Sequence, residues 1–138
     1  MIELIEATIE EQEKITEIMT ASFNYDTAFY FGKDATDGPE GYSDGSLATK
    51  ILTDSTSQTW LISYQGEIAG FLTIDSQKWE VQYFCLFPLF INQGLGTKTW
   101  GKIEEHFGHR PWFLETPAYS TRNHAFYEKL DFAKVGEK

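Results

Sequence analysis

The stretch Phe84–Thr97, FCLFPLFINQGLGT, decides the fold of this chain, because it joins an apolar strand to a helix through a turn with two glycines. Beyond that turn the apolar positions change to helical spacing, with Leu95, Ile103 and Phe107 on one face. Glycines at such a junction let the main chain approach a ligand closely, and the unpaired amides of the first helical turn point towards it. With the positive end of the helix dipole, these amides favour an anion such as a pyrophosphate.

Two known nucleotide-binding turns do not match this stretch. The dinucleotide fingerprint requires a third glycine where the chain has Thr99, and no acidic residue follows a second strand at the usual distance. A Walker-type loop requires its first glycine where the chain has Ile91, and its lysine precedes the threonine, whereas here Lys98 follows Thr97. Both templates are therefore rejected.

A third template matches in register. The pyrophosphate turn of the GNAT N-acetyltransferases is written Gln/Arg-x-x-Gly-x-Gly/Ala and follows a strand and Val-x-Pro; Leu86-Phe87-Pro88 and Gly94-Leu95-Gly96 resemble it. A second motif, Asn123–Phe132 (NHAFYEKLDF), resembles the Asn-x-x-Ala-x-x-Phe-Tyr-Glu-Lys-Leu-Gly-Phe region of the same superfamily, with shorter internal spacing. The resemblance covers nearly the whole chain and is strongest from Thr59 onward.

The amino-acid composition limits the classes of protein to which this chain can belong. We expect residues 1–138 to form a single acetyltransferase-like domain, and a hydrophobic fraction of 41% with 16% aromatic residues argues for a packed globule. No apolar run approaches the roughly 20 residues of a membrane helix, and the first residues lack the basic flank of a signal peptide. We therefore expect a cytoplasmic protein with no membrane partner, and the lone Cys85 agrees with a reducing compartment.

The charge balance is strongly acidic. A formal net charge of -10 repels a nucleic-acid backbone and attracts a cationic substrate, so we expect no nucleic-acid partner. Solubility alone is the alternative explanation of this charge.

Hydrophobic periodicity predicts an α+β fold with a mixed, mostly antiparallel central sheet flanked by helices, in the order βααβββαβαβ. The capping box Thr8–Glu11 starts the first helix. Asn24–Ser46 is rich in glycine, proline, aspartate and tyrosine and is expected to be a loop, with a short helix within it as the alternative. The expected strands are Ile2–Ile5, Thr59–Tyr64, Ile68–Ile74, Glu80–Phe87, Trp112–Glu115 and Phe132–Val135, and the later helices are Leu47–Leu52, Gly94–Phe107 and Asn123–Leu130.

Few residues follow Phe132, so the last strand of the GNAT layout is expected to be missing. An open sheet edge invites pairing with another chain, which gives the hypothesis of a homodimer.

The resemblance implies acetyl-CoA as cosubstrate. Main-chain groups near Leu86 and Phe87 would then bind the pantetheine arm and the thioester carbonyl. Ile91 stands where the family usually has Gln or Arg, so the pyrophosphate must be bound mostly by backbone amides. The implied pyrophosphate contacts are Asn92, Gln93, Gly94, Leu95, Gly96 and Thr97, and those to the CoA arm are Asn123 and Phe126.

Catalysis of acetyl transfer to an amine requires a base and an acid. Tyr127 is the candidate general acid for the departing thiolate; the alternative is a core tyrosine with its hydroxyl at the rim. Glu80, which opens the strand before the glycine turn, is the candidate base, with a water chain as the alternative and Glu115 as a second carboxylate at the acceptor.

Aromatic and acidic residues are mixed between Asn24 and Ser46, and this composition suits an ammonium through charge and cation–π contact. Tyr25, Asp26 and Tyr30 are therefore candidate acceptor contacts, and a solvated loop over packed aromatics is the alternative.

No metal site is expected, because His106 and His109 lack a third ligand at zinc spacing. The predicted function is transfer of acetyl from acetyl-CoA to a primary amine of a small molecule or peptide, by direct attack in a ternary complex. A catalytically silent CoA-binding regulatory or assembly module, and a structural domain that binds no nucleotide, remain as rivals.

Overall fold

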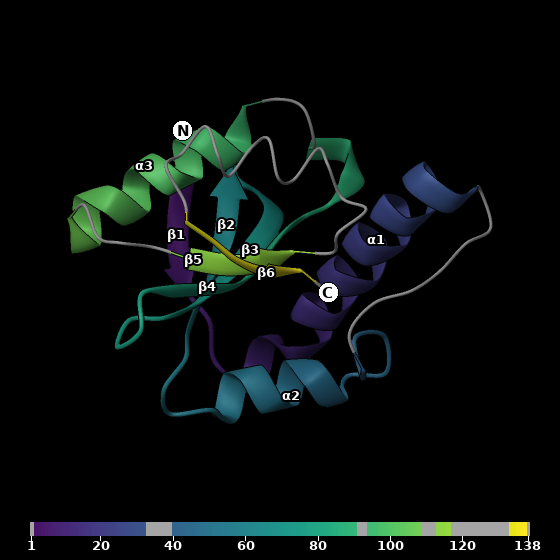
Figure 1. The fold of residues 1–138 in the computed structure, drawn as a ribbon, viewed down its shortest axis with the longest axis horizontal. Helices are drawn as coiled ribbons and strands as arrows, with labels where there is room; N and C mark the ends of the chain where they lie inside the picture. Colours follow the sequence, from purple (N-terminus) through teal and green to yellow (C-terminus); the bar gives the residue numbers. More distant parts are fainter. Residues whose placement is uncertain (1, 33–39, 91–93, 109–112, 117–132, 138) are drawn as a thin grey trace.

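The computed structural model describes residues 2–32, 40–90, 94–108, 113–116 and 133–137 (Figure 1). The side chains of Asp26 and of the last two strands lie outside this description. The strands are β1 (Ile2–Glu6), β2 (Gln58–Tyr64), β3 (Glu67–Asp75), β4 (Glu80–Leu86), β5 (Phe113–Thr116) and β6 (Ala133–Glu137), and the helices are α1 (Gln12–Phe31), α2 (Ser46–Thr53) and α3 (Leu95–Phe107).

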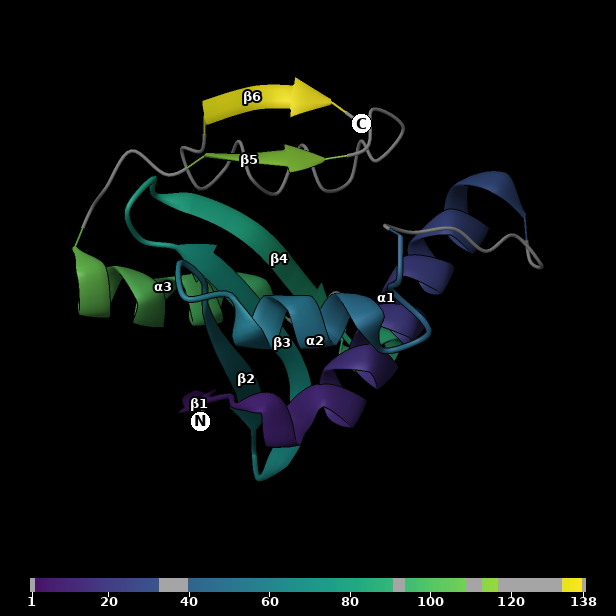
Figure 2. The same cartoon turned by 90° about the horizontal axis from the view of Figure 1, so that it is seen from below.

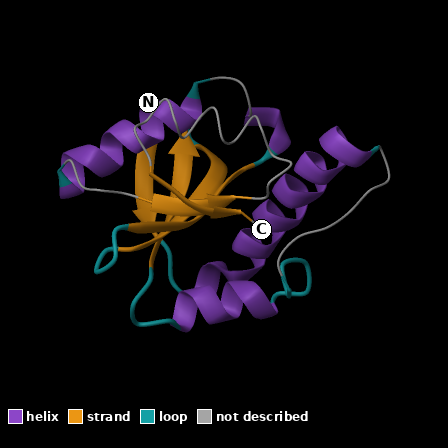
Figure 3. Ribbon diagram, viewed as in Figure 1, coloured by secondary structure: helices purple, strands orange, loops and turns teal. Residues whose placement is uncertain are grey.

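The described strands form one six-stranded sheet in the order β1-β2-β3-β4-β5-β6 (Figure 3). Strands β1 to β4 pair antiparallel, whereas β5 runs parallel to β4 and β6 runs parallel to β5. The predicted α+β class, with its mixed and mostly antiparallel sheet, is therefore confirmed.

Helices cover the sheet on both faces (Figure 1). Helix α3 packs Leu95, Trp100 and Ile103 on one face, against β-strand residues such as Ile62 and Leu72. On the opposite face α1 and α2 contribute a separate buried cluster, made with Leu61, Phe71 and Cys85 of the strands; its helical members are Ile15, Ile18, Met19, Leu47, Ala48 and Ile51. Strand alternation explains the two clusters, since successive side chains leave a strand on opposite faces.

The predicted hairpin is confirmed, because β2 and β3 are joined through Gln65 and Gly66, with φ of 52° and 85°. Positive φ at both central residues matches the twist of an antiparallel pair. The predicted helix Asn123–Leu130 lies outside the described residues.

The expected loop over Asn24–Ser46 is wrong in its first part. Helix α1 continues to Phe31, because no glycine or proline interrupts it before Gly32, whose φ of 118° ends it. Tertiary contacts also hold these last turns, since the Tyr42 hydroxyl donates to Asn24 Oδ1 at 2.7 Å. The turn that carries Tyr42 thus folds back on the helix, a long-range contact that periodicity cannot reveal.

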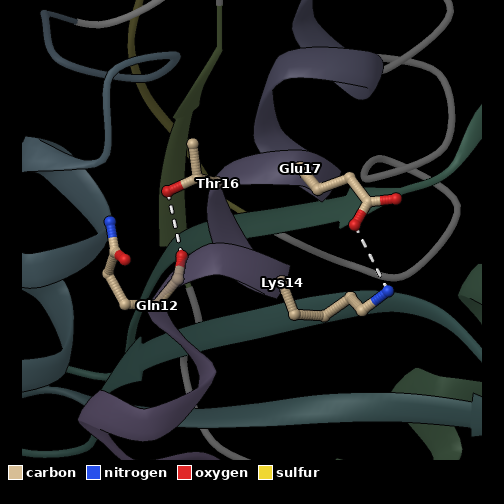
Figure 4. Close-up of polar contacts among 4 residues, drawn as sticks. All are labelled: Gln12, Lys14, Thr16 and Glu17. Carbon is tan, nitrogen blue, oxygen red and sulfur yellow. Dashed lines mark hydrogen bonds and ion pairs between the residues drawn. The ribbon is translucent and has the colours of Figure 1, made fainter.

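The first turns of α1 are tied to the start of α2. Gln12 Nε2 donates to the Gly45 carbonyl oxygen at 3.1 Å, and Thr49 Oγ1 donates to the same oxygen at 2.9 Å. Figure 4 shows the neighbouring contacts, in which Thr16 Oγ1 donates to the Gln12 carbonyl at 2.9 Å. Helix α2 is therefore fixed against α1 by hydrogen bonds as well as by apolar packing.

One polar atom in the α3 layer lacks a partner. Thr99 is 0% exposed, and its Oγ1 makes no hydrogen bond within the described part of the chain. An unsatisfied buried hydroxyl costs about 1–3 kcal/mol, and valine has nearly the same shape. We expect Thr99→Val to raise the free energy of unfolding by about 1 kcal/mol in urea denaturation.

Thr73→Val is the matched control, because Thr73 is also 0% exposed but its Oγ1 lies 2.9 Å from Thr59 Oγ1. That substitution removes a buried hydrogen bond and is expected to lower stability by about 1 kcal/mol. Equal losses in both variants would show that the Thr99 hydroxyl is satisfied in solution.

Candidate functional site

Strands β4 and β5 begin side by side and then diverge, as Figure 2 shows. Among the described residues they pair at one position, Glu80 with Phe113, which are the first residues of the two strands. Parallel strands that stay together would pair along their whole length. Within the described residues the carboxyl end of β4 therefore has no strand paired on its β5 side, and this side is the diverging edge.

Hydrogen bonding to β3 determines which main-chain groups of β4 point towards the diverging edge. Phe87 N donates to the Ala69 carbonyl at 2.8 Å, so this amide is already used. Because main-chain groups alternate along an antiparallel strand, the N–H and C=O of Leu86 point to the side away from β3. Leu86 therefore offers a donor at the diverging edge, and the Phe87 amide does not.

Helix α3 follows this edge in the chain, after a 3-10 turn over Pro88–Phe90. Its N-cap is Gly94, with φ of 75°, and no side chain caps the first turn. Lys98 N bonds to the Gly94 carbonyl at 3.2 Å, so the amides of Leu95, Gly96 and Thr97 precede the first bonded turn. A Cβ built on Gly94 would meet no atom of the described residues within 4 Å, so there is open space at the N-cap position. An uncapped helix start with open space beside it fits an anion.

The first turns of α1 close against the end of β4. Lys14 Nζ lies 5.9 Å from the centroid of the Phe87 ring and 3.3 Å from Glu17 Oε2, the ion pair drawn in Figure 4. The end of β4 is thus packed against α1.

A cavity of about 280 Å³ lies between α2 and the first half of β4. Its described lining residues are Leu47, Lys50, Ile51, Asp54, Ser57, Glu80, Val81, Gln82 and Tyr83. A bulge shapes its β4 wall, since Ile74 pairs with Val81 and Thr73 pairs with Tyr83, which leaves Gln82 as the extra residue. Gln82 Oε1 accepts a hydrogen bond from Ser57 Oγ at 2.7 Å, which links the two walls.

Two ionisable groups in this cavity have shifted pKa values. Partial burial raises the pKa of the Tyr83 hydroxyl, and the neighbouring Cys85 and Glu80 charges raise it further. Tyr83 therefore stays protonated at neutral pH as a hydrogen-bond donor. Hydrogen bonds from the side chain and the amide of Thr56 hold the pKa of Asp54 below its usual value, so Asp54 is a carboxylate.

The predicted site residues are distributed unevenly. Glu80 lines the cavity, and Leu86, Gly94 and Leu95 border the diverging edge and the helix start. Tyr25 and Tyr30 lie on the last turns of α1 and not among the cavity residues. The predicted residues Asn92, Gln93, Asn123, Phe126 and Tyr127 lie outside the described residues, as do the side chains of Asp26 and Glu115.

Sequence reasoning missed the α2 wall of the cavity. Lys50 lies in α2 and Asp54 is the C-cap residue that follows it, and the sequence predicted a helix here but no site residue. The sequence carried no signal for the bulge at Gln82, because Glu80-Val81-Gln82-Tyr83 alternates polar and apolar residues as a regular strand does.

Other kinds of site find no support in the described residues. No cluster of three His, Cys, Asp or Glu side chains that could hold a metal occurs there. Cys85 is buried in the core. No helix in these ranges is long and apolar enough to cross a membrane.

The chain is similar to solved acetyltransferase structures. One is the PaiA N-acetyltransferase from Thermoplasma acidophilum in complex with coenzyme A, with a TM-score of 0.70, 15% identity, and coverage of 94% of this chain and 88% of that one. Another is the YycN acetyltransferase from Bacillus subtilis, described as putative, with a TM-score of 0.67, 16% identity, and coverage of 98% and 94%.

A third is a ribosomal-protein-alanine N-acetyltransferase from Brucella melitensis, with a TM-score of 0.63, 12% identity, and coverage of 98% and 94%. At such identities these likenesses show the fold. No curated protein matches the chain in sequence.

The match to a family model shows to which family the chain belongs. The model described as the acetyltransferase (GNAT) family matches residues 13–132, which includes the glycine turn and the Asn123–Phe132 motif. The chain belongs to the acetyltransferase (GNAT) family.

Proposed function

We propose that this protein is an N-acetyltransferase that moves acetyl from acetyl-CoA to a primary amine by direct attack in a ternary complex. The observation that carries the proposal is the β4 edge, which leaves β5 after Glu80 and is followed in the chain by the uncapped start of α3. One element thereby offers a donor for a carbonyl oxygen and leads to a cradle for a pyrophosphate. Membership of an acetyltransferase family supports this use of the edge.

The cofactor contacts divide between backbone and side chains. The amides of Leu95, Gly96 and Thr97 would hold the pyrophosphate of acetyl-CoA, with Asn92, Gln93 and Gly94 completing the turn. Leu86 would bind the pantetheine arm through its main chain. Asn123 and Phe126 are proposed as further contacts to that arm. A similar protein, PaiA, was solved with coenzyme A, which supports this choice of cosubstrate.

Each catalytic role has a proposed residue. Glu80 takes a proton from the acceptor ammonium, directly or through water, and the freed amine attacks the thioester carbonyl carbon. Leu86 N–H donates to the oxygen that becomes negatively charged. The carbon–sulfur bond then breaks, and Tyr127 gives its proton to the departing thiolate.

The wider expectations are proposals as well. We propose a cytoplasmic enzyme of one domain that requires no metal, binds no nucleic acid and forms a homodimer. A monomer in size-exclusion chromatography with light scattering at micromolar concentration would contradict the last point. The acceptor contacts proposed earlier are Tyr25, Asp26, Tyr30 and Glu115.

A CoA-binding module without catalysis is the second candidate, and the departure at Ile91 is the observation that favours it. Thiol release measured with a panel of primary amines separates the two functions. Tight acetyl-CoA binding in calorimetry with no turnover on any amine would favour the silent module.

Tyr127→Phe tests the proposed acid. We expect turnover to fall about 10-fold or more with CoA affinity nearly kept, because only the proton donor is removed. Tyr64→Phe on β2 is the matched control, since Tyr64 packs against the α3-side core. Unchanged turnover in Tyr127→Phe would remove Tyr127 from the acid role.

A further inference from the structure

The cavity between α2 and β4 carries opposite charges on its two walls. Lys50 extends from α2, and Glu80 belongs to β4. Within the described residues neither side chain forms an ion pair. The charge of Lys50 helps to lower the pKa of Asp54 on the same wall, and the charge of Glu80 helps to raise the pKa of Tyr83 on its own wall. Two charges of opposite sign that do not meet across a cavity are complementary to a ligand with one charge of each sign.

The third charged residue is partly engaged. Asp54 Oδ1 accepts hydrogen bonds from Thr56 N at 2.9 Å and from Thr56 Oγ1 at 2.7 Å. Asp54 therefore serves first as the cap of the turn after α2, and Glu80 is the carboxylate with unused acceptor capacity on the β4 wall.

The remaining lining residues and the volume of the cavity indicate which ligand could bind, both its size and the polarity of its middle part. Leu47 and Ile51 are 8% and 5% exposed, so they give the α2 wall an apolar base. A volume of about 280 Å³ is slightly below the range of about 300–1,000 Å³ that holds drug-sized ligands. A short alkyl chain fits this space.

We propose that this cavity is the acceptor pocket and that the acceptor is a small amine carrying a carboxylate, such as an α- or ω-amino acid. Lys50 binds the carboxylate, and Glu80 receives the ammonium. This inference rests on the proposed acetyl transfer. The position supports it, because the β4 wall of the cavity starts at Glu80, where β5 leaves β4.

The proton balance is the one given for the reaction. Glu80 accepts one proton from the ammonium, and the amine nitrogen forms the new bond to the acetyl carbon as the carbon–sulfur bond breaks. Lys50 keeps its charge throughout, so its role is to bind the far end of the acceptor. It is a specificity residue, and its loss is expected to act on KM.

The test compares three acceptors that differ only in the distal group. With acetyl-CoA and the full chain, thiol release is measured for 4-aminobutyrate, 4-aminobutanamide and 1,4-diaminobutane, and for glycine against glycinamide. We expect kcat/KM for at least one amino acid to exceed that of its amide by about 10-fold or more. Equal use of acid and amide, or a preference for the diamine, would overturn the proposal.

Lys50→Met assigns the preference to the pocket. The variant should lose the preference for acid over amide, mainly through a higher KM for the acid. Lys102→Met, on the exposed side of α3, removes the same charge elsewhere and should keep the preference. A preference that survives Lys50→Met would show that another site selects the acceptor.

Calorimetry with CoA separates this inference from the function on which it rests. If CoA does not bind to the protein, acetyl transfer fails, and the acceptor role falls with it. If CoA binds and amines are acetylated without a preference for the acid, only the acceptor class falls.

Discussion

Gly94→Val is expected to weaken CoA binding at least about 100-fold while the protein stays folded. Gly94 is the N-cap of α3, and a Cβ there would extend into space that no atom occupies within 4 Å. The valine side chain would therefore fill the position proposed for the pyrophosphate, beside the amides of the first turn. Titration calorimetry with CoA measures the effect.

The effect of backbone strain at Gly94 must be distinguished from steric exclusion of the pyrophosphate by the valine side chain. Gly94 has φ of 75°, a conformation that costs a residue with a Cβ roughly 1–2 kcal/mol. Gly108 is the matched control, because it ends the same helix with φ of 77° and a Cβ there would also meet nothing within 4 Å. Gly108→Val should lose similar stability and keep CoA affinity.

Weakened CoA binding in Gly108→Val as well would point to general destabilisation of α3. Normal binding in Gly94→Val would refute the helix start as the cradle.

Local patterns were sufficient to predict most of the fold. The hairpin is predicted correctly because Gln65-Gly66 is a turn signal between two β-rich runs, and α3 because its apolar residues repeat at helical spacing. These properties depend on neighbours in sequence. The last turns of α1 were missed because their support, the bond from Tyr42 to Asn24, comes from a distant segment.

The candidate site shows the same division. The helix start at Gly94 could be predicted, since glycines at a strand-to-helix junction carry a local signal. The pairing that commits the Phe87 amide to Ala69 could not, because strand register depends on tertiary structure. The charge of Lys50 opposite Glu80 also required the structure, because the two residues belong to elements far apart in the chain.

Gly70→Ala is expected to lower the free energy of unfolding by about 3 kcal/mol, at the upper end of the usual cost of overpacking. Gly70 lies in β3 opposite Leu86, where a Cβ would collide with the Cys85 carbonyl oxygen and stand 2.9 Å from the Leu86 Cα. These are backbone atoms, so the collision cannot be relieved by a rotamer change. Urea denaturation measures the loss.

Gly101→Ala is the control for the substitution itself. Gly101 is exposed in the middle of α3, and a Cβ there would meet nothing within 4 Å, so alanine should stabilise the helix by roughly 0.5–1 kcal/mol. The same chemical change is thus expected to have opposite signs at the two glycines.

The collision at Gly70 also reaches the proposed chemistry, because any shift of Cys85 and Leu86 moves the donor at the diverging edge. We therefore expect the folded fraction of Gly70→Ala to acetylate amines more slowly, through a lower kcat. Wild-type stability in this variant would mean that β4 lies farther from β3 than the structure shows. Lost stability with an unchanged kcat would instead show that the Leu86 amide takes no part in catalysis.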